Sequence, residues 1–221
     1  MKFSPKHAAA GATAALASVA LAGSLTTGSA TATAGDGDGT GARLVHTHAK
    51  LLPLNSSGVA GNADVHVKNR RIHVEVDAHG LAAGLPHAQH IHYGNKARNE
   101  CPTIADDSNG DFRLTTLEGL PAYGPVRVSL TTRGGTGAAS GLAVDRFPTA
   151  PKGHVHYDRH TRTGKRVAQA IRDGEAVVVI HGVDYNDNGT YDFKSAGKSD
   201  LNPDLPAEAT DPATCGLLRR R

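Results

Sequence analysis

Histidines that alternate along the chain are the residues of this sequence best suited to metal chemistry. Residues i and i+2 of a β-strand project from the same face, so a His-x-His pair places two imidazoles side by side. Two imidazoles at that spacing can bind one transition-metal ion, and nitrogen ligands suit Cu(II) and Zn(II). Three such pairs occur: His46 and His48, His90 and His92, and His154 and His156.

The spacing alone does not separate a metal site from chance. Random placement of 13 histidines in 221 residues gives roughly 0.8 His-x-His pairs. The first and third pairs belong to predicted strands on which solvated histidines are unremarkable. In the central pair, by contrast, the intervening Ile91 is expected to face the core, and the residues around the pair are distinctive.

Residues 107–118 carry oxygen ligands at positions 1, 3, 5, 9 and 12 of an EF-hand-type loop, the pattern that binds calcium. Phe112 stands where the pattern has glycine, so the sharp turn requires an altered backbone. The side chains predicted to bind calcium are Asp107, Asn109, Asp111 and Glu118.

A second calcium loop is predicted three residues after His181. It has Gly189 at position 6, but Ser195 at position 12, and it could also help to shape a site at His181. The alternative for both loops is that Asn-Gly and Asp-rich stretches are turns between strands. The predicted ligands of the second loop are Asp184, Asn186, Asn188 and Asp192.

Other catalytic chemistry has little support. The chain has no Gly-rich phosphate loop at a strand–helix junction, no Gly-x-Ser-x-Gly, and no local arrangement that singles out a Ser-His-Asp triad. Removing Lys2 and Lys6 from the 24 basic residues leaves 22 against 21 acidic ones. That balance gives no argument for a nucleic-acid partner.

The first 34 residues are expected to be a secretory signal peptide. Lys2 and Lys6 precede an apolar run, 8–25, and Ala32-Thr33-Ala34 supplies an A-x-A cleavage site after Ala34. Residues 35–42 then form a flexible linker, and 43–221 a single domain. The mature protein is expected to be secreted, with no membrane span once the leader is removed.

Cys101 and Cys215 both lie in the part predicted to be exported. An even number of cysteines outside the cell usually means a disulfide, although a reduced structural pair is the alternative. A bridge between them would close a loop of more than a hundred residues, worth roughly 4–5 kcal/mol in the chain-entropy model.

The elements that must position these residues are mainly β-strands. Alternating apolar residues in 65–67 and 72–76, around a turn at Asn69-Arg70, predict a hairpin, and 126–130 and 155–157 repeat the alternation. The run 176–180 suits a strand buried on both faces. Only 165–172 is predicted to be helical, and 199–214 an irregular loop. The fold class is therefore all-β, an antiparallel sandwich or barrel.

Several landmarks occur in the order found in one known family. Gly80-Leu81 and Gly84-Leu85 precede His90-Ile91-His92, Cys101 follows, and Ile180-His181 and Ala213-Thr214-Cys215-Gly216 come later. In this order the chain resembles the copper/zinc superoxide dismutase superfamily over roughly 44–218. The resemblance implies a Greek-key β-sandwich of about eight strands, a Cys101–Cys215 disulfide, copper held by His90, His92 and His181, and superoxide as the small-molecule partner.

The chain also departs from that family. No histidine lies between Cys101 and Gly153, so the family's zinc site does not carry over, and Pro212 stands where the family has a substrate-guiding arginine. A fourth copper ligand could be His154, His156, His160 or solvent.

Chordin-type (CHRD) extracellular domains are a second family that the chain resembles. They imply a non-catalytic binding or structural module, so the sequence leaves open whether the protein is an enzyme. It also does not decide between a monomer and a homodimer.

Overall fold

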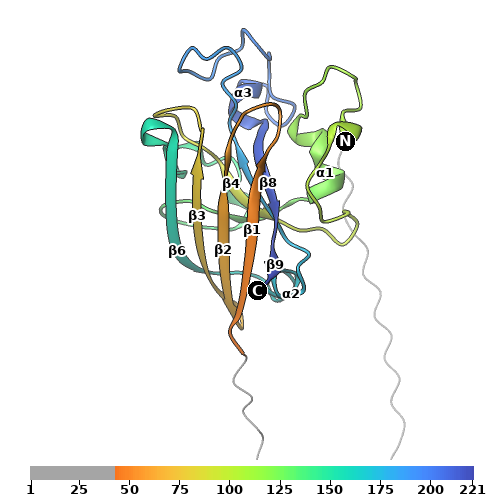
Figure 1. The fold of residues 1–221 in the computed structure, drawn as a ribbon, viewed down its shortest axis with the longest axis vertical. Coiled ribbons are helices and arrows are strands. Elements are labelled where there is room, and N and C mark those ends of the chain that lie inside the picture. Colours follow the sequence, from red (N-terminus) through yellow and green to blue (C-terminus); the bar gives the residue numbers. More distant parts are fainter. Residues whose placement is uncertain (1–42) are drawn as a thin grey trace, which may run out of the picture. The chain divides into compact units, whose positions relative to one another are not determined.

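The computed structural model describes residues 43–221, and these form an antiparallel β-sheet with short helices (Figure 1). The predicted leader, its cleavage site at Ala34 and the linker 35–42 lie outside the described residues. The strands are β1 Val45–Pro53, β2 Ala60–Lys68, β3 Arg71–His79, β4 Gln89–His92, β5 Val126–Ser129, β6 His154–Arg162, β7 Val177–His181, β8 Pro212–Leu217 and β9 Arg219–Arg220. The helices are α1 Thr116–Tyr123, α2 Lys165–Asp173 and α3 Ala207–Thr210, with 3₁₀ turns at Ile104–Asp106, Ala138–Ser140, Val144–Arg146 and Pro151–Gly153.

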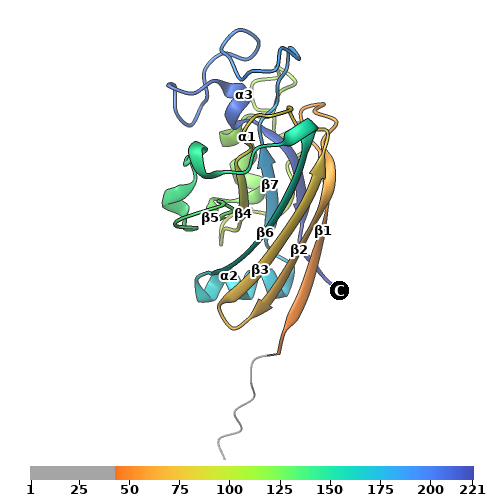
Figure 2. The same ribbon diagram turned by 90° about the vertical axis from the view of Figure 1, so that its left-hand side faces the viewer.

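The strands follow the order β5-β4-β7-β8-β1-β2-β3-β6, with the short β9 beside β1. All the pairs are antiparallel. The connections from β3 to β4, β5 to β6 and β6 to β7 cross between the two halves of the sheet. The sheet curls so that β1, β2, β3 and β6 face β4, β5 and β7 (Figure 2). The predicted all-β Greek-key class is confirmed.

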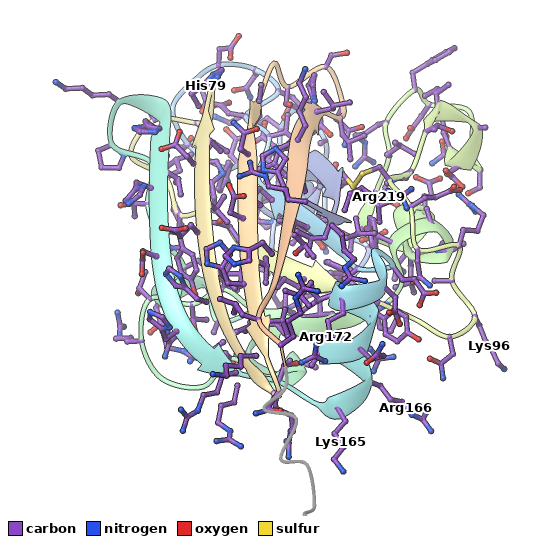
Figure 3. All side chains as sticks on the ribbon, turned by 60° about the horizontal axis from the view of Figure 1, so that its bottom comes forward. His79, Lys96, Lys165, Arg166, Arg172 and Arg219 are labelled. Atoms are coloured by element: carbon purple, nitrogen blue, oxygen red, sulfur yellow. A yellow bond between two sulfur atoms is a disulfide. The ribbon has the colours of Figure 1, made fainter. Side chains whose placement is uncertain are left out.

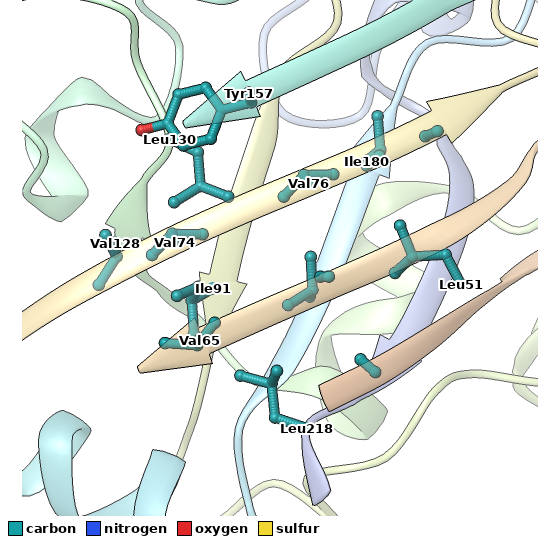
Figure 4. Close-up of a cluster of buried hydrophobic side chains, with 14 of the residues drawn as sticks. Leu51, Val65, Val74, Val76, Ile91, Val128, Leu130, Tyr157, Ile180 and Leu218 are labelled. Atoms are coloured by element: carbon teal, nitrogen blue, oxygen red, sulfur yellow. The ribbon is translucent and has the colours of Figure 1, made fainter. Parts of the chain in front are cut away.

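The core lies between the two halves and follows the predicted alternation. Val65 on β2 and Val74 on β3 have no exposed surface, and they share one cluster with Ile91 of β4 and Ile180 of β7 (Figure 4). Each fully buried aliphatic side chain contributes about 1.5–3 kcal/mol of burial free energy. Because Ile91 faces this core, its neighbours His90 and His92 project from the opposite face of β4.

The predicted hairpin is confirmed residue by residue. Lys68 pairs with Arg71, so Asn69 and Arg70 form the two-residue turn, and Asn69 has φ 56°. Asparagine tolerates this left-handed conformation better than other side-chain-bearing residues. The run 176–180 is also buried as predicted and forms most of β7.

One predicted helix is confirmed, but two others were missed. The helix predicted at 165–172 is α2, which ends at Gly174 with φ 79°. Figure 3 shows it with Lys165 and Arg166 projecting outward, at the end of the sheet opposite His79. The expectation of a single helix was wrong, because α1 also forms. Its Gly119 and Pro121 are unfavourable in a helix and so hid it from prediction, although a capping box of Thr115 and Glu118 marks its start.

The irregular loop predicted at 199–214 is also partly wrong. It contains α3 and the first residues of β8. The side chain of Thr210 donates a hydrogen bond to Ser199 Oγ and fixes one end of the segment to the other.

The disulfide between Cys101 and Cys215 is present, with a Cα–Cα distance of 5.7 Å (Figure 3). It ties the segment that follows β4 to β8, which pairs with β7. The two strands that carry the candidate histidines are therefore connected by hydrogen bonds and, through β8, by a covalent bridge.

Candidate metal centre

His90, His92 and His181 converge on one point. The first two project from β4, and His181 is the last residue of β7, which pairs with β4. One ring nitrogen from each histidine lies within 4.8 Å of those of the other two. All three side chains are buried. The predicted ligand set is thus brought together by the pairing of two strands that are 85 or more residues apart in sequence.

Each of these rings uses one nitrogen to bond a backbone carbonyl. Nε2 of His90 lies 3.1 Å from the oxygen of Gly141, and Nδ1 of His92 lies 2.7 Å from that of Gly124. Nδ1 of His181 lies 2.6 Å from the oxygen of Thr210. A carbonyl oxygen only accepts, so the nitrogen facing it must carry the proton. These bonds set the tautomer and the orientation of each ring, as is usual for metal-binding histidines.

The other nitrogen of each ring is buried without a hydrogen-bond partner among residues 43–221. The three atoms are Nδ1 of His90, Nε2 of His92 and Nε2 of His181. A buried polar atom without a partner costs roughly 1–3 kcal/mol. In the neutral ring each of these nitrogens carries a lone pair, so the site fits a metal ion that accepts three imidazole nitrogens.

Burial keeps these histidines neutral. It is the largest cause that lowers the pKa of His92 to about 3 and that of His181 to about 4. Burial, followed by the nearby rings of His181 and His92, lowers the pKa of His90 well below its ordinary value. Metal binding therefore needs no proton to be removed from any of the three at neutral pH.

A cavity of about 230 Å³ opens beside the three histidines. Its wall is apolar, with Leu142, Val144 and Leu205 among the contributing side chains. The histidines are the only titratable residues among those that line it in the described part of the chain. A cavity of this size admits a small molecule, and its wall carries no charge to attract one.

The other two His-x-His pairs do not reach this centre. His46 and His48 lie on β1 and His154 and His156 on β6, in the opposite half of the sheet. His154 and His156 are exposed and lie beside Asp77, as expected of a solvated face.

His160, another candidate fourth ligand, stacks on His73 at a ring distance of 4.0 Å. It lies on the same exposed face of β6 as His154 and His156, which alternate with the buried Val155 and Tyr157. The three histidines expected as alternative fourth ligands therefore all lie on this exposed face and away from the buried centre.

Pro212, which stands in place of the family's guiding arginine, pairs with His181 at an irregular position of the β7–β8 ladder. Arg113, which sequence reasoning missed, is a cation that bonds the residue next to Pro212. Its guanidinium binds the carboxylate of Asp211 at 2.7 Å and does not line the cavity. The charge of Arg113 is therefore matched by Asp211 beside the site.

The first predicted calcium loop has its carboxylates turned toward its own backbone. Asp107 accepts hydrogen bonds from the N–H groups of Gly110 and Phe112, and Glu118 accepts from Ser108 and Thr115. Partial burial alone would raise the pKa of Glu118, but these bonds lower it to about 2. Asp111 accepts from Arg113 and from the side chain of Asn109. Phe112 has φ 63°, the left-handed conformation that the pattern assigns to glycine.

The second predicted loop has a similar turn and a buried carboxylate behind it. Asp184 accepts from the N–H groups of Asn188 and Gly189, Asn186 accepts from Asn188, and Asp192 bonds the side chain of Asn188. Glu208 of α3 is fully buried and bonds the backbone of Asp192 and the hydroxyl of Ser195. Sequence reasoning missed Glu208 because it lies outside the twelve-residue loop pattern that starts at Asp184.

The second loop also contacts the metal-centre segment. The hydroxyl of Tyr191 lies 3.2 Å from Nδ1 of His87, and this nitrogen lies 2.9 Å from the backbone oxygen of His181. His87 was not singled out in the sequence, although it is fully buried. The expectation that this loop helps to shape the site at His181 agrees with these contacts.

No protein-family model and no curated protein matches this chain. Within the described residues, no helix is both long and apolar enough to span a membrane.

Proposed function

We propose that this chain is an exported copper protein of the superoxide dismutase-like kind, in which His90, His92 and His181 hold one copper ion. The observation that carries the proposal is the set of three unpartnered, inward-facing ring nitrogens. The leader pattern in residues 1–34 supports export, and the disulfide agrees with an oxidising compartment.

Copper fits this donor set better than calcium or magnesium, because imidazole nitrogen is a borderline ligand and hard cations prefer oxygen. Three neutral imidazoles add no negative charge to the site, so they favour the singly charged Cu(I) and make bound Cu(II) easier to reduce, while nitrogen ligands still bind Cu(II) well. Bound copper that alternates between these two states would supply the electron transfer by which two superoxide ions and two protons become dioxygen and hydrogen peroxide.

The chain itself contributes the positioning of the site. The carbonyls of Gly124, Gly141 and Thr210 hold the three rings in their tautomers, so little reorganisation is needed on binding. The apolar wall at Leu142 and Leu205 limits how much water reaches the histidines. The access of a small anion to the centre then depends on size more than on charge.

A second candidate is a non-catalytic extracellular module of the CHRD kind. It is favoured by Pro212 and by the uncharged cavity wall, because superoxide capture is accelerated by a positive field around the site. In this case the histidines bind copper for stability or storage, and superoxide is not consumed.

The test uses the mature chain, residues 35–221, loaded with copper. We expect His92→Ala to bind one copper per chain fewer than the wild type and to lose the EPR signal with nitrogen coupling from three imidazoles. His156→Ala is the matched control, because it removes an exposed histidine of a second His-x-His pair and should leave copper binding unchanged. Copper content that is equal in wild type and His92→Ala rejects the site.

Superoxide consumption by the same samples separates the two functions. Consumption that requires copper and disappears in His92→Ala supports the redox function. Stoichiometric copper with the three-nitrogen spectrum, but with no superoxide consumption above that of the metal-free protein, rejects the enzyme and supports the CHRD-like module.

A further inference from the structure

A row of four histidines crosses the exposed face of the other half of the sheet. His46, His66, His73 and His160 occupy directly opposed positions on β1, β2, β3 and β6. The ring centroids of successive members are 4.2, 5.6 and 4.0 Å apart. The imidazoles of four neighbouring strands are thus close enough for adjacent members to share one ion.

The centre of this row has a carboxylate beside it. Glu75 follows His73 by two residues on β3 and therefore projects from the same face. One ligand atom from each of His66, His73 and Glu75 lies within 4.8 Å of the other two. Among residues 43–221, the only other group with this property is the buried histidine triad.

The surroundings orient these side chains. Nε2 of His73 lies 3.1 Å from Oδ2 of Asp158, and when this nitrogen carries the proton, Nδ1 keeps the lone pair. A histidine that bonds a carboxylate through one nitrogen and a metal through the other is a recurring arrangement in zinc sites. Burial, followed by the charges of His46 and His73, also lowers the pKa of His66.

This cluster is separate from the buried centre. His66 alternates with Val65 and Val67, and His73 alternates with Ile72 and Val74, which are all buried in the core. The imidazoles at 66 and 73 therefore project away from the core on one half of the sheet, whereas His90 and His92 project away from it on the other half. The hydrophobic core lies between the two clusters.

We propose that His66, His73 and Glu75 form a second metal site, which binds a zinc ion on the outer face of β2 and β3. Two imidazoles and one carboxylate are a recurring zinc donor set, and the partly exposed position leaves the fourth place to water. The assignment does not depend on copper at the buried centre, because it uses different residues on a different face.

The test measures zinc binding to the mature chain in a His92→Ala background, which disables the buried centre. Isothermal titration with zinc chloride should give one ion per chain. Adding His66→Ala and His73→Ala should weaken binding by at least about tenfold, since removing an outer partner alone costs 10–100-fold. The matched control adds His154→Ala and His156→Ala, which remove two histidines from the same exposed face and should leave the affinity within about twofold.

A second variant keeps the conclusion independent of folding defects. Glu75→Gln preserves the size of the side chain and both histidines, and it should also weaken zinc binding by about tenfold or more. Zinc should shift the NMR signals of the rings at 66 and 73, but not those of His154. The proposed site is rejected if Glu75→Gln binds zinc as tightly as the parent protein. It is also rejected if the His66/His73 and His154/His156 double variants lose equal amounts of zinc affinity.

Discussion

The guanidinium of Arg113 donates a hydrogen bond across 2.7 Å to Oδ2 of Asp211, the residue that follows Thr210. Thr210 supplies the carbonyl that orients His181. Asp211 also accepts from the hydroxyl of Tyr185, and only 1% of its surface is exposed. This ion pair therefore joins the first predicted calcium loop, residues 107–118, to the segment that supports the metal centre.

Replacing Arg113 by alanine should destabilise the protein by about 2–4 kcal/mol, because it leaves the buried carboxylate of Asp211 without its cation. Urea unfolding measures the loss. Arg133→Ala is the control, since its pair with Asp145 is mostly exposed and should contribute less than about 1 kcal/mol. Asp211→Asn should restore part of the stability of the Arg113 variant. Equal losses in Arg113→Ala and Arg133→Ala would contradict the role of the pair.

The stability of the metal-free protein should fall as the pH falls from 6.5 toward 4. Burial keeps the pKa values of His90, His92 and His181 below their ordinary value, so the unfolded chain takes up protons that the folded one does not. Asp211 acts in the opposite direction, because burial raises its pKa to about 6 and the folded state holds that proton. As the pH falls, the three histidines lower the free energy of unfolding and the one carboxyl raises it. The net change in this free energy is about 3 kcal/mol per pH unit near pH 5.

Urea unfolding of chelator-treated protein at pH 5, 6 and 7 measures this slope. Asp211→Asn should make it steeper, since it removes the opposing group. Stability that is independent of pH over this range would show that the three histidines are not held neutral by burial.

Gly124→Ala should weaken copper binding by about 10–100-fold, because the carbonyl of Gly124 orients His92. Gly124 has φ 80°, and an added Cβ would lie 2.8 Å from the backbone nitrogen of Gly94, so the chain must shift. Copper titration measures the affinity. Gly137→Ala is the control, since its added Cβ meets no atom within 4 Å and its φ is −79°. The same loss of affinity in both variants would contradict this explanation.

Removing the disulfide should lower stability by about 4 kcal/mol, because the bridge closes a loop with a sequence separation of 114 residues. The double variant Cys101→Ser and Cys215→Ser, compared with wild type in urea, measures the effect. A loss below about 1 kcal/mol would mean that the unfolded chain is already restricted without the bridge.

Phe112→Gly, in the first predicted calcium loop, should raise the free energy of unfolding by about 0.5–1 kcal/mol. Phe112 has φ 63° and is 84% exposed, so it bears the left-handed strain without compensating burial. The melting temperature should rise, and millimolar calcium should raise it further if the loop binds calcium as the sequence predicts. Phe112→Ala retains a Cβ and serves as the control. An equal gain from alanine and glycine would show that backbone strain is not the cause.

Local patterns were sufficient to predict several elements of this protein. Alternation predicted the hairpin of β2 and β3, the uniform apolar run predicted β7, and the stretch 165–172 was correctly predicted to be helical. These elements could be predicted because their burial leaves a local pattern in the sequence, either periodic, as in β2, β3 and α2, or uniform, as in β7. The helix α1 could not, because Gly119 and Pro121 contradict local helix propensity and the capping box and packing of Tyr123 override it.

The sequence by itself determined the all-β class. The resemblance carried by the order of its landmarks predicted that His90, His92 and His181 come together, and that Cys101 pairs with Cys215. Only the tertiary structure decided which ring nitrogen faces the centre, because the carbonyls of Gly124, Gly141 and Thr210 come from segments distant in sequence. The pairing of His66 with His73 could follow from the hairpin, but the rows formed with β1 and β6 depend on strand order. Strand order is set by packing of the whole core, which no local pattern encodes.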